Sequence, residues 1–176
     1  MKRLRVLMTR EEIVPERLVG ATAVVLDVFL ATTTLLTILE NGARCVFPVA
    51  SLEEAEDTRE KLGAPSVLRG GEQGAERIDG YDHGPFPEEY PHETVANRDV
   101  VYVTTNGTRA IADAAPAERV LLGCLRNAPA VARYLEGSRT APAGSSPSPA
   151  WRRPRRRGES STPRRSSAAA SRTPRG

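Results

Sequence analysis

Long apolar runs, cysteines and aromatic residues are all scarce in this chain of 176 residues. No stretch is long and apolar enough to span a membrane, and the basic start at residues 1–8 lacks the apolar core and cleavage site of a secretion signal. The two cysteines, Cys45 and Cys124, have no metal-type spacing, so they predict reduced core thiols in a cytoplasmic protein. These absences, together with the lack of any internal repeat, exclude membrane-spanning proteins, disulfide frameworks and solenoids.

Charge divides the chain into two unlike parts. The formal net charge of +3 combines a net −6 in residues 1–137 with a net +9 in residues 138–176. Residues 1–137 predict one α/β domain. Residues 138–176 consist mainly of Arg, Ser, Pro and Ala with a single aromatic residue, Trp151, and predict a disordered basic tail because they cannot bury enough apolar surface.

Three interpretations of this tail are open. Clustered arginines bind nucleic acid non-specifically, and they also contact anionic membrane surfaces. The third interpretation is a shifted reading frame that replaces the true C-terminal portion. The abrupt change in composition and the absence of Lys favour the shifted frame, so we expect neither a specific nucleic acid nor a membrane as partner.

Strand-like and helix-like segments alternate along the first part of the chain. Apolar runs predict strands at residues 4–8, 21–29, 44–50, 66–68, 100–103 and 119–125. Helical patterns predict helices through residues 35–39, 52–62, 108–115 and 127–136, and residues 70–97 read as irregular. This order predicts an α/β fold with three layers, α/β/α, around a mostly parallel sheet.

Residues 99–110 are the most informative stretch. An apolar strand passes through small polar residues into an alanine-rich helix, which brings hydroxyls, backbone N–H groups and a helix N-terminus together. Arg109 adds a forked guanidinium suited to phosphate or sulfonate oxygens. The stretch therefore predicts an anion site, and the alternative is an ordinary capped turn, because Thr and Asn are common caps.

Other polar residues also follow predicted strands. Ligands of such sheets bind at the carboxyl ends of the strands, where we expect these side chains to meet. Carboxylates beside an anion turn and arginines are typical of Mg²⁺-assisted phosphoryl chemistry. The catalytic candidates are Asp27, Glu72 and Arg109. The candidate metal ligands are Asp27, Glu72, Asp79 and Asp82. The candidates for substrate binding are Thr32, Thr33, Arg69, Thr104, Thr105, Asn106, Gly107 and Thr108. For any single carboxylate the alternative is a solvated loop charge, and it is the combination that favours a site.

Four segments carry a resemblance to a known family. DVFLATTTLLTILENGA, LRGGEQGAERIDGYDHG, VTTNGTRA and LLGCLRNAPAVA, in this order and spacing, resemble the 2-phosphosulfolactate phosphatases over roughly residues 3–136. The resemblance implies a magnesium-dependent phosphatase of coenzyme M biosynthesis. Its substrate would be a small phosphate ester carrying a carboxylate and a sulfonate, converted to 3-sulfolactate and phosphate. Assembly into a homo-oligomer is left open. The alternative function is a catalytically inactive α/β module that binds an anion.

The chain departs from the family pattern in three places. Leu30 stands where the family usually has an arginine, and residues 84–87 read Gly-Pro-Phe-Pro where the family usually reads Gly-Asn-Ser-Pro. Family members continue with further strands and helices where this chain has its tail, so the second half of the fold is expected to be incomplete. The apolar faces of residues 119–125 and 127–136 would then stay uncovered, which predicts poor stability.

Overall fold

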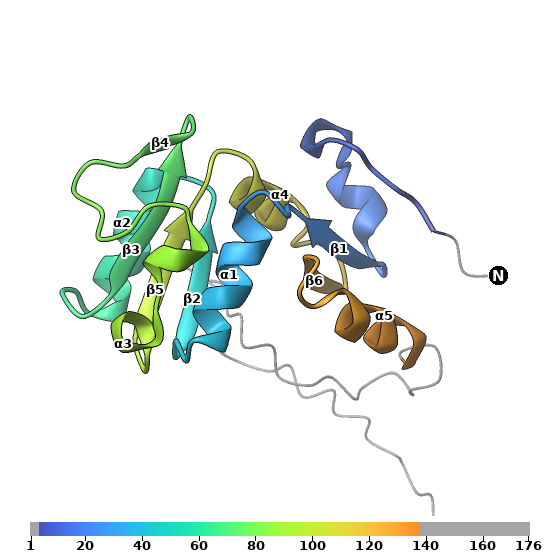
Figure 1. The fold of residues 1–176 in the computed structure, drawn as a ribbon. Helices are drawn as coiled ribbons and strands as arrows, with labels where there is room; N and C mark the ends of the chain where they lie inside the picture. Colours follow the sequence, from blue (N-terminus) through green and yellow to red (C-terminus); the bar gives the residue numbers. More distant parts are fainter. Residues whose placement is uncertain (1–3, 138–176) are drawn as a thin grey trace, which may run out of the picture.

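The structure, a computed structural model, describes residues 4–137, and the tail predicted from residue 138 onward lies outside them. Its strands form two separate sheets (Figure 1). The larger sheet has the order β2 (Cys45–Val49), β5 (Asp99–Val103), β3 (Leu68–Gln73) and β4 (Glu76–Arg77). The smaller sheet pairs β1 (Thr22–Leu26) with β6 (Arg119–Gly123). All these pairings are parallel except that of β3 with β4, so the predicted α/β fold with mostly parallel strands is confirmed.

Helices cover both faces of the four-stranded sheet. The long helices are α1 (Ala31–Glu40), α2 (Leu52–Leu62) and α5 (Ala128–Gly137), and the short ones are α3 (His92–Val95) and α4 (Gly107–Asp113). Three 3₁₀ turns lie at Arg10–Glu12, Pro15–Leu18 and Pro87–Glu89. One buried cluster joins one face of this sheet to α1, α3 and α4, and a second joins the opposite face to α2, which gives the predicted three layers.

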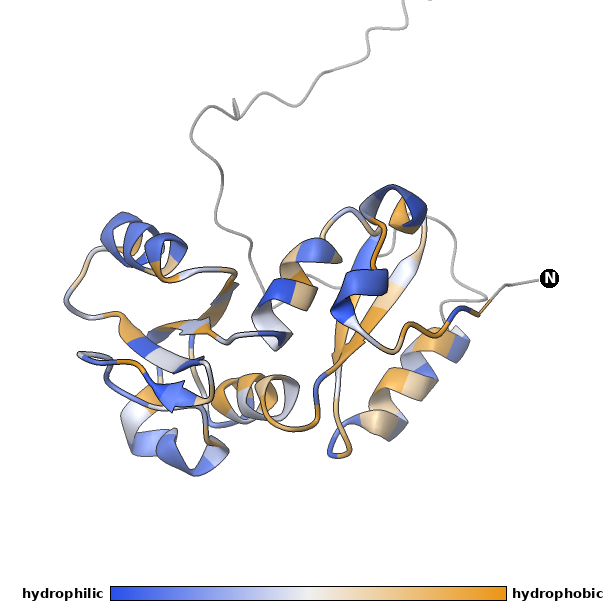
Figure 2. Ribbon diagram, turned by 90° about the horizontal axis from the view of Figure 1, so that it is seen from above, coloured by the Kyte–Doolittle hydropathy of each residue, from blue (hydrophilic) through white to orange (hydrophobic). Residues whose placement is uncertain are grey.

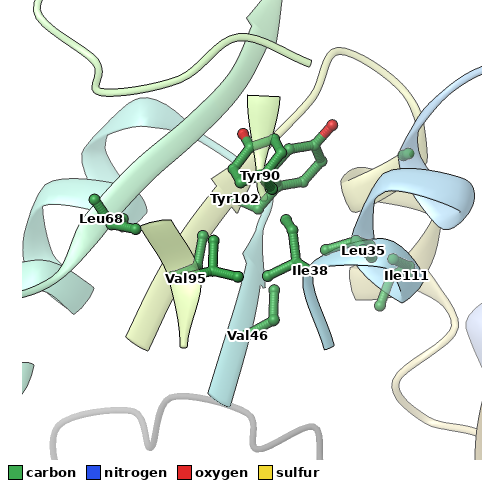
Figure 3. Packing of buried hydrophobic residues seen from close by; sticks show 10 residues of the cluster. Leu35, Ile38, Val46, Leu68, Tyr90, Val95, Tyr102 and Ile111 are labelled. Carbon is green, nitrogen blue, oxygen red and sulfur yellow. The ribbon is translucent and has the colours of Figure 1, made fainter. Parts of the chain in front are cut away.

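Strand β5 is the centre of this packing because all five of its residues are buried. Its side chains alternate between faces, as the pleat of a strand requires. Val100 and Tyr102 join the cluster of α1, where Ile38 and Tyr90 also lie (Figure 3). Val101 and Val103 join the cluster of α2. Each such side chain stabilises the fold by roughly 1.5–3 kcal/mol when fully buried.

Helix α2 shows how the sequence sets an element's limits. The Ser51 hydroxyl accepts from the backbone N–H of Glu54 at 3.1 Å, and the Glu54 carboxylate accepts from the N–H of Ala50 at 2.9 Å. Gly63 ends the helix with φ +85°, a conformation that favours glycine. Figure 2 shows the hydrophilic colour of this helix, whose buried residues are only Ala55 and Thr58.

Three sequence expectations need correction. Residues 4–8 form no strand, and Leu4 and Met8 are 89% and 82% exposed. The strand predicted at 66–68 instead runs over Leu68–Gln73, so Gly70 and Gly71 belong to this strand rather than to the predicted irregular segment. A Cβ on Gly70 would lie 1.9 Å from the Tyr90 hydroxyl oxygen, so this glycine serves close packing. Residues 70–97, read as irregular, also contain β4, α3 and a 3₁₀ turn.

The two-stranded sheet is far more open than the other. Only Gly123 of its ten residues is buried, and α5 contains no buried residue. Leu26 and Leu125 are 68% and 80% exposed. The expectation of uncovered apolar surface on residues 119–136 thus agrees with the structure, and its consequence for stability stays a prediction. Among residues 4–137 no helix has the length and apolar character needed to cross a membrane.

Candidate active site

A cavity of about 250 Å³ opens at one edge of the four-stranded sheet, where the parallel strands β2, β5 and β3 end. Its walls come from the junction of β2 with α2, from the ends of β3 and β5, and from α4. The lining residues that carry chemistry are Ser51, Leu52, Glu53, Glu72, Thr105 and Arg109. Glu72, Thr105 and Arg109 were predicted from sequence, and the structure brings them together.

The turn between β5 and α4 is built by two threonines. The N–H of Thr104 donates to the Thr108 hydroxyl at 2.9 Å, and the N–H of Thr108 donates to the Thr104 hydroxyl at 3.0 Å. Both side chains are buried. Reciprocal pairing of this kind satisfies the free N–H groups at a helix start. The two residues therefore shape the turn. Thr104, predicted from sequence, also lines the cavity, whereas Thr108 does not, and their predicted role in substrate binding stays a prediction.

The remaining donors of this turn hold the carboxylate of Glu72. Thr105 donates its backbone N–H to Oε1 at 2.6 Å and its hydroxyl to Oε2 at 2.8 Å. Ala75 donates its N–H to Oε2 at 2.8 Å. The turn thus does bind an anion, and that anion is one of the chain's own side chains. Asn106, the predicted binding residue beside it, is exposed.

Arg109 supplies the positive charge of the cavity. Its Nε donates to the carbonyl oxygen of Ala50 at 3.2 Å, which fixes the guanidinium against the end of β2. Within residues 4–137 no other hydrogen bond or ion pair of this guanidinium is found, so its two terminal nitrogens are available to a ligand. Leu52 and Glu53 in the first turn of α2 also line the cavity, so the partly positive start of this helix and an acidic residue both lie on its wall.

Asp27 follows β1 and lies against the start of α4. A Cβ on Gly107 would come within 2.4 Å of Asp27 Oδ2 and of the Ala31 Cβ, so only glycine fits here. Burial raises the pKa of Asp27 above its ordinary value, and the negative charge of Glu72 adds to this rise. Hydrogen bonds from the backbone N–H groups of residues 29–31 oppose it. The charge of Glu72 thus acts on Asp27, although Asp27 itself does not line the cavity.

The threonines of α1 act as internal ties. The Thr32 hydroxyl is buried and bonds the carbonyl oxygens of Asp27 and Gly123 at 2.7 and 2.8 Å, joining the ends of β1 and β6. The Thr33 hydroxyl donates to the carbonyl of Val28 at 2.9 Å. Neither residue lines the cavity. Their predicted role in substrate binding stays a prediction, and their observed contacts are structural.

Arg69, Asp79 and Asp82 lie apart from the cavity. The side chain of Arg69 donates to Glu56 Oε1 at 3.0 Å and to the carbonyl of Gly80, and its backbone N–H donates to Asp82 Oδ2 at 2.8 Å. Asp82 therefore stands near the start of β3, whereas Glu72 stands near its end. Asp79 is exposed and does not line the cavity.

Within the described part of the chain no group of three or more His, Cys, Asp or Glu side chains is placed to hold a metal ion. The ligand role of all four predicted carboxylates stays a prediction. Asp79 and Asp82 lie apart from the cavity, so the pair considered for a shared ion is Asp27 and Glu72. This pair still fits Mg²⁺, which often takes only one or two carboxylates and completes its shell with waters and phosphate oxygens. The mutual repulsion of the two carboxylates is also what a divalent cation would relieve.

Sequence reasoning missed the contribution of residues 51–53. The signal was present, because the capping pair Ser51 and Glu54 follows a predicted strand and marks a helix N-terminus at the same edge of the sheet.

Pro85 stands at one of the positions where the chain departs from the family pattern. Its carbonyl oxygen accepts hydrogen bonds from the hydroxyls of Thr34 and Tyr102 at 2.7 and 3.0 Å. Phe86 next to it is 47% exposed.

This chain is similar in sequence to known proteins. The family profile described as 2-phosphosulpholactate phosphatase matches residues 7–142. The chain belongs to this family. A "Probable 2-phosphosulfolactate phosphatase" of Clostridium beijerinckii is 37% identical over 133 residues, which cover 76% of this chain and 56% of the relative.

Two further relatives carry the same name. The protein of Caldanaerobacter subterraneus subsp. tengcongensis is 43% identical over 115 residues, covering 65% of this chain and 48% of the relative. That of Symbiobacterium thermophilum is 47% identical over 120 residues, covering 68% and 52%. The chain therefore spans about half the length of the curated relatives it matches.

Proposed function

We propose that this chain is a magnesium-dependent phosphatase acting on a small acidic phosphate ester, and that 2-phosphosulfolactate is its substrate. The observation that carries the proposal is the guanidinium of Arg109, which lines a small cavity beside the carboxylate of Glu72. The family and the names of the relatives support it. Cytoplasmic location and a place in coenzyme M biosynthesis belong to the same proposal.

The phosphate end of the substrate would lie against Arg109. Its two terminal nitrogens form a fork that matches two phosphate oxygens, and the N–H groups at the start of α2 add partial positive charge. A charge-assisted hydrogen bond of this type contributes roughly 1.5–3 kcal/mol. The Glu53 carboxylate on the same wall repels a bare phosphate, which favours a substrate whose charge is partly neutralised.

Asp27 and Glu72 would hold the Mg²⁺. When bound, such an ion neutralises phosphate oxygens and lowers the pKa of a coordinated water. In the hydrolysis water attacks phosphorus, the bond from phosphorus to the ester oxygen breaks, and that oxygen receives a proton to give the alcohol. Within this reaction the chain's own part would be to orient the phosphate through Arg109 and to supply the carboxylates of Glu72, which lines the cavity, and Asp27, which follows β1.

Phosphate release from a panel of small phosphate esters, with and without Mg²⁺, tests the proposal. We expect metal-dependent release from 2-phosphosulfolactate, its loss in Asp27→Asn, and a fall of about one to two decades in substrate affinity in Arg109→Ala. Arg109→Lys should also weaken binding, because the charge remains but the fork is lost. Arg133→Ala on the exposed face of α5 is the matched control and should match the parent.

Two results would contradict the proposal. If Arg109→Ala binds inorganic phosphate as tightly as the parent, the arginine has only a structural role. If phosphate raises the melting temperature but no ester is hydrolysed with Mg²⁺ present, the chain is the inactive anion-binding module that is the alternative function.

A further inference from the structure

The hairpin between β3 and β4 is fastened to the turn that follows β5. Gly74 and Ala75 form its two-residue turn with φ of +64° and +66°, the pair of left-handed conformations that a tight hairpin requires. The N–H of Gly74 donates to the Thr105 hydroxyl oxygen at 2.7 Å. The N–H of Ala75 donates to Glu72 Oε2 at 2.8 Å. Both free donors of the hairpin tip therefore meet at Thr105 and Glu72.

These contacts determine the direction of the Thr105 hydroxyl proton. Because the hydroxyl oxygen accepts from Gly74, its own proton is left for Glu72 Oε2, which lies 2.8 Å away. The backbone N–H of Thr105 is likewise given to Oε1 at 2.6 Å. Thr105 thus has no donor left for a substrate, although it lines the cavity.

The same contacts leave one part of the Glu72 carboxylate open. A carboxylate has about four acceptor positions, two on each oxygen. Oε2 uses both of its positions, on Thr105 and Ala75, whereas Oε1 uses one, on the Thr105 N–H. Oε1 is therefore the oxygen that retains an acceptor position for a cation or a bound water.

We propose that Thr105 is a positioning residue, which fixes the Glu72 carboxylate so that Oε1 faces the cation site of the proposed phosphatase. This inference rests on the proposed function for its metal, and it assigns Thr105 no contact with the substrate. Partners that orient a metal-binding carboxylate typically change metal affinity or activity by about 10–100-fold when removed. Thr105 is expected to act in this way through its hydroxyl, because the backbone N–H survives any substitution.

The test compares Thr105→Val, Thr105→Ser and the parent. Valine keeps the β-branched shape and loses the hydroxyl, and serine keeps the hydroxyl. Titration calorimetry with Mg²⁺ alone should show about 10–100-fold weaker binding for Thr105→Val, with Thr105→Ser close to the parent. The matched control is Thr22→Val. Thr22 is exposed and begins β1, at the end of the strand away from Asp27, so this variant should bind Mg²⁺ like the parent.

A second measurement reads the contact directly and needs no metal. The amide proton of Gly74 should exchange faster with solvent in Thr105→Val than in the parent, because its acceptor is gone, and Thr105→Ser should restore the slow exchange. Circular dichroism and thermal unfolding of each variant establish that the fold is retained.

The outcomes separate this inference from the proposed function. One outcome is that the parent hydrolyses no ester while Thr105→Val binds Mg²⁺ more weakly than Thr105→Ser and the parent. In that case the proposed function fails and the role of Thr105 stands. If the parent is an active phosphatase and Thr105→Val binds Mg²⁺ equally well, the role of Thr105 fails and the function stands. Absence of any Mg²⁺ binding by the folded parent, or failure of serine to restore it, would also overturn the inference.

Discussion

Strand β5 of the four-stranded sheet and strand β6 of the two-stranded sheet are similar apolar strands with parallel partners, yet their surroundings differ. Every residue of β5 is buried between α2 on one face and α1 with α4 on the other. In β6 only Gly123 is buried, and the helix that follows, α5, buries none of its residues. An apolar strand sequence therefore specifies the strand, whereas its burial depends on which elements cover it.

This difference separates the parts of the candidate site. Arg109, Glu72 and Thr105 stand on the well-packed region, where the cavity lies between ends of strands with buried side chains. Asp27 instead follows β1 of the open region, and it meets the cavity side only through Gly107 of α4 and through its repulsion by Glu72. The proposed phosphate-binding half of the site thus stands on the well-packed region, and the proposed metal-binding half spans both regions.

The largest expected contrast comes from two glycines. A Cβ on Gly71 of β3 would lie 1.8 Å from the backbone oxygen of Val103, and its φ of +124° is one that other residues rarely adopt. Gly71→Ala should lower the free energy of unfolding by about 4 kcal/mol, from overpacking and backbone strain together. Chemical denaturation measures it.

The matched substitution lies in the open sheet. A Cβ on Gly123 would lie 2.5 Å from the end of the Leu26 side chain and 3.3 Å from Val24 Cγ1. Both neighbours are side chains, and Leu26 is 68% exposed and can rotate away. Gly123→Ala should therefore cost less than about 1 kcal/mol. If Gly71→Ala and Gly123→Ala lower the free energy of unfolding equally, the two sheets are equally rigid and the contrast between them is wrong.

A smaller effect is expected at the joint between the regions. The raised pKa of Asp27 means that the folded state holds this proton more tightly than the unfolded state does. The resulting stabilisation is present below the unfolded pKa and is lost as pH rises through the folded pKa. Without metal, the melting temperature of the parent should fall more steeply than that of Asp27→Asn as pH rises above the ordinary aspartate pKa of 3.8. If the melting temperatures of the parent and of Asp27→Asn change with pH in the same way, burial does not raise the pKa of Asp27.

Much of the fold follows from local sequence signals. The apolar runs near β1, β2, β5 and β6 and the caps of α2 identified these elements to within a few residues. Residues 4–8 failed because their pattern is that of a strand but the structure gives them no partner strand. Gly70 and Gly71 were assigned to an irregular segment, since a sequence does not reveal that a tyrosine ring and a carbonyl will occupy the space of their Cβ atoms.

The candidate site was predicted in part for a similar reason. Placement after a strand located Glu72 and Arg109 correctly at the cavity. The same rule misplaced Asp82, because the chain reverses at Gly74 and Ala75 and returns to the start of β3. Thr105 was read as a substrate donor, and its engagement with Glu72 depends on a pairing across 33 positions of sequence that no local pattern encodes.

Residue-resolved amide hydrogen exchange under native conditions tests the central claim most directly, because it measures the free energy of opening at each backbone hydrogen bond. The account predicts that amides of β2, β3 and β5 exchange only by the slowest openings, whereas those of β1, β6 and α5 exchange through smaller and more frequent ones. A single cooperative unit, with β6 and α5 protected as strongly as β5, would contradict it and show that the described chain is self-sufficient without further cover.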